Sequence, residues 1–376
     1  MKVAIVHDDL MRRGGAEQVV LSMLKVYPEA DLFTLAYRAD HTYPEFRDHK
    51  VKTSLYNIIA FNEYIMKWLF FPTGWLCMKM LRVKGYDLVL ISNTYCAKYV
   101  NIDKKAKVFM YTHTPFRFAW NPTSYVEYNR SGGLKRKLYD LVIKWLRKID
   151  RKEAQKGDYF IGITKEAAQR ISEAYLVDDV AIINPPVKCE NFYLAENPTE
   201  DYYLLVSRFE FYKKVDVAIA AFNKMKKKLI IVGKGSREKE LRQMAGETVE
   251  FLSGVSKETI ADLFANCKAF IFPQHEDYGI TPLEANAAGR PVIAYGDGGV
   301  LETQIPYTTS GQPFTAVFFK EQTADSLIAA VEQFEKLKPD PVFIRNHAEK
   351  FGEPAFMAAL SGYITPRLGS IEYHGS

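Results

Sequence analysis

The sequence has only four cysteines, and no two of them stand at a spacing typical of a metal site or a redox pair. This scarcity argues against a disulfide framework and is typical of a reducing compartment. Long apolar runs are also missing, because Pro72 and Gly74 interrupt the most apolar stretch, residues 68–78, far below the roughly 20 residues that cross a bilayer. The first apolar run ends at His7, so we expect neither a signal peptide nor a spanning helix, and we expect a cytoplasmic protein.

Two familiar nucleotide motifs are absent as well. The chain has no G-x-G-x-x-G fingerprint after a strand, and GKGS at 233–236 lacks the upstream glycine of a P-loop. These absences disfavour a dinucleotide-dependent enzyme and an ATPase. With 376 residues, 48% of them hydrophobic and 25% charged, the chain has the size and balance of a folded protein of two domains.

Positive charge is concentrated in one segment, although the net charge is only +5. Residues 51–150 contain 17 Lys or Arg and 6 Asp or Glu, and they contain all four tryptophans, Trp68, Trp75, Trp120 and Trp145. Cationic and aromatic surface is typical of a protein that rests on an anionic membrane. Nucleic acid is a competing partner, and ordinary core and solvated residues are a third interpretation. Because no nucleic-acid-binding motif is present, we expect no nucleic-acid partner and keep an anionic membrane surface as a candidate.

Short apolar runs recur along the chain, and a helical pattern follows each of them. Runs without polar alternation are buried on both faces, which predicts strands of a parallel sheet covered by helices. Five runs lie in the first half, at 3–6, 88–91, 108–111, 159–163 and 180–183, and five in the second, at 203–206, 229–232, 249–252, 269–272 and 292–295. The sequence therefore predicts an α/β protein with two Rossmann-like, doubly wound domains.

The domain boundary is expected at the proline pair that follows the fifth run. We assign residues 1–184 to an N-terminal, acceptor-side domain and residues 185–352 to a C-terminal domain that binds the donor. A last helical pattern at 353–365 follows the second sheet, and we expect it to pack back onto the N-terminal domain.

Candidate residues are sought in the loops after strands, because ligands of open α/β sheets bind beyond the carboxyl ends of the strands. Gly14 and Gly15 open a helix there, where free amides suit an anion, although a common turn explains the pair equally well. His113 follows a buried strand and precedes Pro115. Its imidazole is predicted either to hydrogen-bond a substrate or to hold its own loop.

A second group of candidates is cationic. Arg208 follows a strand, and Lys213 and Lys214 precede the next helix. Arg and Lys at this spacing clamp a diphosphate and stabilise a departing nucleoside diphosphate, whereas solvated charges at a helix start are the alternative. The paired Gly298 and Gly299 in a later loop indicate either a close backbone approach to a ligand or a simple turn.

Two carboxylates, Glu276 and Glu284, flank a loop of seven residues. Thr281, Pro282 and Glu284 fit the N-cap, N1 and N3 positions of a capping box. The same geometry points the amides of residues 279–283 and the positive helix end toward a phosphate. Glu276 has no capping role, so its carboxylate is predicted to accept hydrogen bonds from sugar hydroxyls.

The loops taken together resemble a known family. The pattern E-(seven residues)-E in EDYGITPLE, with EANAAGRPVIA and DGGVLE after it, resembles the signature of family 4 glycosyltransferases, and SRFEFYKK resembles their phosphate motif. With RRGGAE and YTHTPFRFAWN the resemblance spans nearly the whole chain, and HTPFRFAW resembles bacterial mannosyltransferases of O-antigen or exopolysaccharide synthesis. The resemblance implies the GT-B fold, in which two Rossmann-like domains face each other across a cleft.

The resemblance also implies roles for single residues. Arg208 and Lys214 would hold the diphosphate, with Lys213 the less favoured neighbour, Glu276 would bind the donor sugar, and Glu284 would bind the ribose. His113 would approach the sugar, Gly15 the diphosphate or acceptor, and Val255 and Ser256 the base. The predicted catalytic residues are His113, Arg208, Lys214 and Glu276, and the predicted donor-binding residues are Gly15, Lys213, Val255, Ser256, Gly279, Ile280, Thr281, Pro282, Leu283 and Glu284.

The implied activity is a retaining transfer of a hexose, mannose from GDP-mannose, to a lipid-linked or oligosaccharide acceptor in the synthesis of cell-surface polysaccharide such as lipopolysaccharide. Such enzymes use a nucleotide sugar, no other cofactor and no bound metal, and the dispersed His and Cys residues agree with that. We expect a peripheral protein on the inner face of the cytoplasmic membrane. A UDP-sugar donor and a catalytically silent, nucleotide-sugar-binding scaffold remain the alternatives.

Overall fold

The computed structural model describes residues 1–60 and 73–369. Residue contacts divide the chain into two compact units. The N-terminal unit comprises residues 1–186 together with the segment from Phe356 onward, and the C-terminal unit comprises Val187–Ala355. Trp68, part of the predicted membrane-facing segment, lies outside the described residues.

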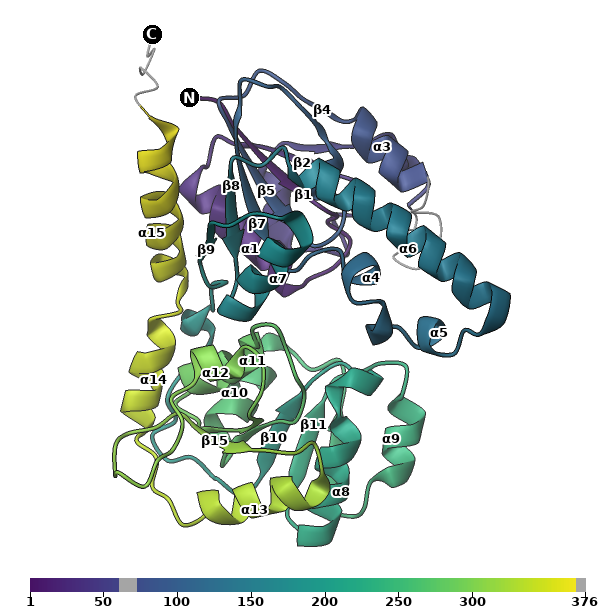
Figure 1. The fold of residues 1–376 in the computed structure, drawn as a ribbon. Coiled ribbons are helices and arrows are strands. Elements are labelled where there is room, and N and C mark those ends of the chain that lie inside the picture. The colour runs from purple at the N-terminus through teal and green to yellow at the C-terminus, as the bar shows by residue number, and fades with distance from the viewer. Residues whose placement is uncertain (61–72, 370–376) are drawn as a thin grey trace. The chain divides into compact units, whose positions relative to one another are not determined.

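The N-terminal unit is built on a seven-stranded parallel sheet with the order β3-β2-β1-β5-β7-β8-β9 (Figure 1). Its strands are β1 (Val3–His7), β2 (Asp31–Thr34), β3 (Val51–Thr53), β5 (Leu88–Asn93), β7 (Lys107–Thr112), β8 (Tyr159–Gly162) and β9 (Val180–Ile182). The predicted apolar runs form five of these strands. The predictions missed β2 and β3, because these short strands begin or continue with charged residues and form no apolar run.

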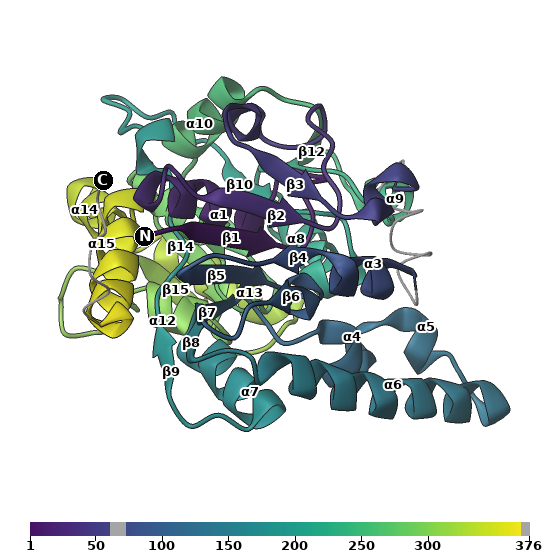
Figure 2. The ribbon, with the colours of Figure 1, turned by 90° about the horizontal axis from the view of Figure 1, so that it is seen from above.

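Helices cover both faces of this sheet (Figure 2). They are α1 (Gly15–Val26), α3 (Trp75–Met80), α4 (Arg117–Trp120), α5 (Val126–Asn129), α6 (Gly133–Ala154), α7 (Lys165–Tyr175) and α15 (Glu353–Ile364). Short elements join them, namely η1 (Pro44–Asp48), η2 (Leu55–Ile58), β4 (Arg82–Val83), η4 (Ala97–Tyr99), β6 (Asn101–Ile102), η5 (Pro122–Ser124) and η8 (Thr365–Leu368).

Helix α15 belongs to the N-terminal unit by its contacts. The ring of Phe356 lies 6.0 Å from that of Tyr111 on β7, and the ring of Tyr363 lies 6.2 Å from Phe109 and 6.5 Å from Tyr159 on β8. Edge-to-face packing of this kind adds about 0.5–1.5 kcal/mol per pair to the burial of the rings. The end of the chain therefore completes the covering of a sheet formed by its first half.

The C-terminal unit contains a six-stranded parallel sheet with the order β12-β11-β10-β13-β14-β15. The strands are β10 (Tyr203–Val206), β11 (Leu229–Val232), β12 (Val249–Leu252), β13 (Phe270–Phe272), β14 (Val292–Tyr295) and β15 (Ala316–Phe319). The helical elements are η6 (Cys189–Asn191), η7 (Phe211–Lys213), α8 (Val215–Met225), α9 (Glu238–Met244), α10 (Lys257–Asn266), α11 (Ile280–Ala287), α12 (Val300–Thr303), α13 (Ala324–Phe334) and α14 (Pro341–Glu349). The sequence predicted every strand except β15.

The order of strands determines where a ligand binds. In the C-terminal unit the order reverses between β10 and β13, and open α/β sheets bind ligands at such a reversal, so we expect a ligand beside the loops after these two strands. In the N-terminal unit the same reversal occurs between β1 and β5. Within the described ranges, no helix combines the length and the apolar character that a bilayer span requires.

Candidate functional site

The loops after β10 and β13 are joined by an ion pair in the C-terminal unit. The Nζ atom of Lys213, from η7, contacts the carboxylate of Glu276, from the loop after β13. The side chain of Lys213 is only 10% exposed, whereas that of Glu276 is 26% exposed. Lys214 was predicted to hold the diphosphate in preference to Lys213, and the pairing of Lys213 with Glu276 leaves that prediction untested.

Arg208 and Lys214 lie in the same loop after β10. The guanidinium of Arg208 is exposed and donates a hydrogen bond of 2.9 Å to the hydroxyl of Tyr212. Lys214 takes the left-handed conformation, with φ of 52°, at the N-cap of α8, and its Nζ lies 4.9 Å from the ring centre of Phe211. Neither cation is paired with a carboxylate in the described part of the chain, so both charges can meet an anion.

Helix α11 begins earlier than the sequence analysis predicted. Its N-cap is Gly279, with φ of 82°, and Ile280 is the first helical residue. The predicted capping box is therefore wrong: Thr281 is the second helical residue, Pro282 the third and Glu284 the fifth. The physical reason is that glycine reaches the left-handed conformation at low cost, and proline is tolerated in a first turn whose amides have no partner within the helix.

This earlier start also changes which backbone amides are free to bind a ligand at the N-terminus of α11. Pro282 has no N–H, and Leu283 is the fourth helical residue, so its amide enters the helical ladder. The side chains of both are buried. The first turn therefore offers the amides of Ile280 and Thr281 and the positive end of the helix dipole to an anion.

Glu284 has no structural partner in the described residues. With the capping role removed, its carboxyl makes no hydrogen bond or ion pair, although the side chain is partly buried. Burial raises the pKa of Glu284 to about 7, because the charged form loses hydration and gains nothing in return. A partly buried carboxyl without a partner is suited to accept hydrogen bonds from a ligand.

The glycine pair after β14 holds the backbone that carries Glu276. The amide of Gly299 donates to the carbonyl of Glu276 over 2.8 Å, and Glu276 and Gly298 form an isolated bridge. A Cβ on Gly299 would lie 2.5 Å from the Cα of Tyr278. The two glycines are thus required for close contact between two loops of the protein itself.

Val255 and Ser256 follow β12, which β11 separates from β10 in the sheet. The hydroxyl of Ser256 accepts a hydrogen bond of 3.1 Å from the amide of Thr259 and caps α10. The structure therefore gives Ser256 a clear local role. Val255 is partly exposed beside it.

In the N-terminal unit, His113 ends a chain of polar side chains. Its Nε2 lies 3.0 Å from the Oγ of Ser92, which lies 3.1 Å from the Nδ1 of His7, whose Nε2 lies 3.9 Å from the carboxylate of Glu17. Burial, together with the nearby His7, lowers the pKa of His113 to about 4, although the residue is not completely enclosed. His113 is therefore neutral near pH 7 and is positioned by Ser92.

Gly15 is the first residue of α1, and Gly14 is its N-cap. A Cβ on Gly14 would lie 2.6 Å from the carboxylate of Glu17, so this glycine makes room for the residue that ends the polar chain. Arg12 contacts the same carboxylate over 3.4 Å.

The sequence analysis missed the buried carboxylate of Asp8, which orders the loop after β5. It accepts hydrogen bonds from the amides of Thr94, Cys96 and Ala97, all within 2.6 Å. Although burial opposes ionisation, the pKa of Asp8 is lowered, since His7 and these donors favour the carboxylate. Its position directly after β1 was the available signal, because the next loop of the reversed sheet meets that point.

Comparison with known proteins identifies the C-terminal unit. The family described as Glycosyl transferases group 1 matches residues 190–355. Among curated relatives, Alpha-1,3/1,6-mannosyltransferase ALG2 of Saccharomyces cerevisiae is 22% identical over 89% of this chain and 77% of its own length. O-antigen chain mannosyltransferase C of Escherichia coli is 31% identical over 26% of this chain and 29% of its own length.

Solved structures agree on the fold. Anabaena Alr3699/HepE, crystallised with UDP, has a TM-score of 0.71 at 15% identity and covers 97% of this chain and 100% of its own. Sucrose-phosphate synthase of Thermosynechococcus elongatus has a TM-score of 0.71 at 16% identity, with 98% of this chain and 99% of its own covered. Each unit thus has the fold of a GT-B glycosyltransferase domain, residues 190–355 match the group 1 glycosyl transferases, and the chain is a glycosyltransferase.

Proposed function

We propose that this glycosyltransferase is a retaining enzyme of family 4 that transfers mannose from GDP-mannose to a lipid-linked or glycan acceptor in cell-surface polysaccharide synthesis. The names of its relatives, which include mannosyltransferases of two kinds, support the sugar. The segment HTPFRFAW supports the donor by its resemblance to bacterial enzymes of that specificity.

The main support for the proposal is the composition of the loops at the strand reversal of the C-terminal unit. Among the described residues these loops combine unpaired cations with carboxyl groups that can accept hydrogen bonds from sugar and ribose hydroxyls. Arg208, Lys214 and the first turn of α11 supply positive charge for a diphosphate. Glu284 is a carboxyl without a partner among the described residues, and we assign it to the ribose hydroxyls. Glu276, held by Lys213, accepts hydroxyls of the donor sugar.

The chemical task of these groups is to stabilise charge that develops on the departing nucleoside diphosphate. Fixed donors that meet this charge in the transition state lower the barrier more than donors that bind the ground state equally well. The acceptor hydroxyl bonds to the anomeric carbon on the face from which the diphosphate leaves, as the bond between that carbon and the diphosphate oxygen breaks. The hydroxyl proton passes to the departing diphosphate, and attack on the same face retains the configuration. Neutral His113 hydrogen-bonds a sugar hydroxyl in this scheme. We propose that Arg208 and Lys214 make a bound metal unnecessary.

A UDP-sugar donor is the second candidate, because one structural neighbour, Anabaena Alr3699/HepE, was crystallised with UDP and with UDP-glucose. We assign the choice between bases to the loop that contains Val255 and Ser256. A silent binding protein is the third candidate, and the presence of all five residues Arg208, Lys214, Glu276, Glu284 and His113 counts against it.

Calorimetric titration with GDP, UDP, GDP-mannose and UDP-glucose, without added metal, tests the proposal on wild type and on Glu276→Ala. We expect GDP-mannose to bind preferentially and the substitution to weaken it while GDP binding changes little. Tighter UDP binding would favour the second candidate. Absence of binding by all four would leave a silent protein.

We also propose that the enzyme acts as a peripheral protein at the inner face of the cytoplasmic membrane, where a lipid-linked acceptor is available. The excess of Lys and Arg in residues 51–150 supports this location, because anionic lipid attracts such segments. Loss of binding to anionic vesicles at low salt would count against it.

A further inference from the structure

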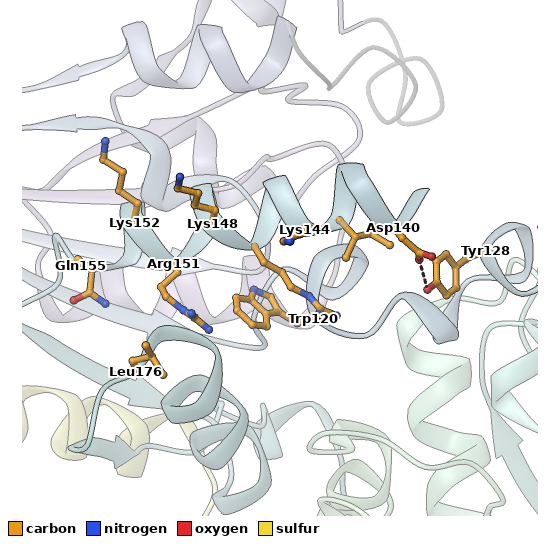
Figure 3. Close-up of a pocket in the computed structure, with 11 residues that line it drawn as sticks. Trp120, Tyr128, Asp140, Lys144, Lys148, Arg151, Lys152, Gln155 and Leu176 are labelled. Atoms are coloured by element: carbon orange, nitrogen blue, oxygen red, sulfur yellow. Dashed lines mark hydrogen bonds between the residues drawn. The ribbon is translucent and has the colours of Figure 1, made fainter. Parts of the chain in front are cut away.

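A hollow on the surface of the N-terminal unit has five cationic residues among the eleven that line it (Figure 3). It measures about 870 Å³ and lies along α6, with Trp120 of α4 in its wall and Leu176 after α7 at one side. Its five basic residues are Lys144, Arg147, Lys148, Arg151 and Lys152. All five come from successive turns of α6, where residues three and four apart are neighbours, so they form one band along the helix.

Both arginines are held in place by the protein. The Nε of Arg147 donates to the carbonyl of Ala119 over 2.7 Å, and the Nε of Arg151 donates to the carbonyl of Ala174 over 2.8 Å. The two guanidinium groups lie 5.5 Å and 5.2 Å from the ring centre of Trp120. Because only Nε is used, the terminal nitrogens of both forks remain available as donors.

No carboxylate neutralises these cations in the described part of the chain. Asp140 is the one acidic residue in the lining, and it accepts a hydrogen bond of 2.8 Å from Tyr128 and lies 3.5 Å from Arg136. An uncompensated group of five positive charges with two fixed forks suits phosphate groups.

The same helix carries an exposed apolar stripe. Leu134, Leu138, Leu141 and Trp145 are 84%, 61%, 66% and 44% exposed, and their spacing of four, three and four residues places them on one face of α6. Both ribbon views show the N-terminal half of α6 projecting away from the sheet (Figure 1, Figure 2). Free phosphate has no apolar part that could contact such a stripe.

We propose that α6 docks on an anionic phospholipid surface, with the hollow binding lipid phosphates and the stripe entering the boundary between headgroups and acyl chains. A helix with leucines and tryptophan on one face and Lys and Arg beside them has the composition that binds at this depth. The inference rests on the proposed lipid-linked acceptor and deepens it, because it assigns membrane contact to one helix and two groups of side chains.

Co-sedimentation with vesicles tests the assignment. We expect wild type to bind vesicles of phosphatidylglycerol and phosphatidylcholine at low salt and to bind pure phosphatidylcholine vesicles weakly. The variant K144Q/K148Q/K152Q should bind the anionic vesicles at least about tenfold more weakly, since each cation near such a surface contributes substantially. The variant L138Q/L141Q should lose binding that high salt does not remove, because its contribution is not electrostatic.

Two control variants match these changes elsewhere in the chain. K104Q/K105Q/K107Q removes three exposed lysines of the N-terminal unit, and L301Q/V342Q replaces side chains that are 54% and 56% exposed in the C-terminal unit. Both should bind vesicles as wild type does. Equal losses of vesicle binding in K144Q/K148Q/K152Q and K104Q/K105Q/K107Q would refute the hollow as a lipid site. Unchanged vesicle binding of L138Q/L141Q would refute the role of the stripe.

Further outcomes separate the ligand and the proposed function. Binding of inorganic pyrophosphate without binding of vesicles would indicate that the hollow takes a free anion. Binding of single-stranded RNA without binding of vesicles would indicate a nucleic acid. Calorimetric binding of GDP-mannose should be the same in all variants. Wild type that binds GDP-mannose and not vesicles would refute the docking face alone, whereas wild type that binds vesicles and no nucleotide sugar would refute the proposed function alone.

Discussion

The ammonium of Lys213 is paired with the carboxylate of Glu276, which ties the loop after β10 to the loop after β13. Lys213 is nearly enclosed, so the ion pair offsets part of the hydration that its ammonium loses on burial. A sugar that hydrogen-bonds Glu276 would meet a carboxylate whose position is already fixed. The pair thus links the stability of the C-terminal unit to the proposed site.

Glu276→Gln should destabilise the protein and impair transfer. Removing one partner of a buried pair costs about 3–5 kcal/mol, and we expect about 1–3 kcal/mol here because Glu276 is partly exposed. The double variant K213M/E276Q should regain stability and should not regain activity. Thermal unfolding and a transfer assay check both parts, and recovered activity in the double variant would argue against a role of Glu276 in sugar binding.

Arg208→Ala should weaken GDP binding about tenfold to a hundredfold, the effect of losing charge-assisted hydrogen bonds worth about 1.5–3 kcal/mol. Arg242→Ala is the control, because this exposed arginine pairs with Glu238 on α9. Calorimetry at two salt concentrations checks the prediction. Unchanged GDP affinity would remove Arg208 from the site.

Glu284→Gln should have opposite effects on stability and on binding. The pKa of Glu284 is raised to about 7 in the folded protein, so its contribution to stability is fully present below the unfolded pKa and is lost as pH rises through 7. The variant should therefore unfold at a higher temperature than wild type at pH 8, with a smaller difference at pH 5. Its GDP affinity at pH 8 should be lower, because an ionised carboxyl accepts ribose hydroxyls better than an amide.

Proton release gives an independent check on Glu284. If the ribose binds the carboxylate, GDP binding near pH 6 should release a proton, whereas binding at pH 8.5 should not. Calorimetry in buffers of different ionisation enthalpy measures this. Release that persists in Glu284→Gln would assign the proton to another group.

The pH dependence of kcat/KM should show no limb from His113 between pH 5 and 8. Since the pKa of His113 is lowered to about 4, the ring stays neutral over this range. His113→Ala should reduce kcat/KM, and Ser92→Ala should reduce it less, because Ser92 positions the ring without touching substrate. A limb near pH 6.5 that disappears in His113→Ala would contradict the lowered pKa.

Gly299→Ala should lower transfer with little change in GDP affinity. The added methyl group would lie 2.5 Å from the backbone of Tyr278 and would displace the loop that carries Glu276. Gly311→Ala is a useful control, because a Cβ there meets nothing within 4 Å, although its left-handed φ makes a modest strain expected. Normal activity in Gly299→Ala would show that Glu276 tolerates this displacement.

Sequence reasoning predicted the elements whose signal is local. Ten apolar runs correspond to strands, whereas β2, which begins with Asp31, and the short β3 owe their pairing to neighbours and gave no such signal. The loops that contain Arg208 and Glu276 follow strands, as predicted, whereas the roles of these two residues stay predictions. The start of α11 was placed too late, because the left-handed φ of Gly279 competes with a well-formed capping motif and cannot be weighed from residue types alone.

Contacts between distant segments were beyond local reasoning. The preference for Lys214 over Lys213 as the principal cation did not anticipate the pair with Glu276, which depends on the meeting of two loops at a strand reversal. The chain from His113 through Ser92 and His7 to Glu17 depends on register between β1, β5 and β7. Neither the ion pair nor the polar chain could be predicted from the spacing of these residues in the sequence.

The position of α15 makes the C-terminal unit an insertion within the N-terminal one. A fragment that ends at residue 186 would lack Phe356 and Tyr363 and would leave aromatic rings of β7 and β8 uncovered. The two crossing segments run side by side, with 2.9 Å between the amide of Val187 and the carbonyl of Phe351. The C-terminal unit can thus be exchanged as one continuous block between two chain crossings, and if it binds the donor as proposed, such exchange is a route to chimeric enzymes with a new sugar specificity.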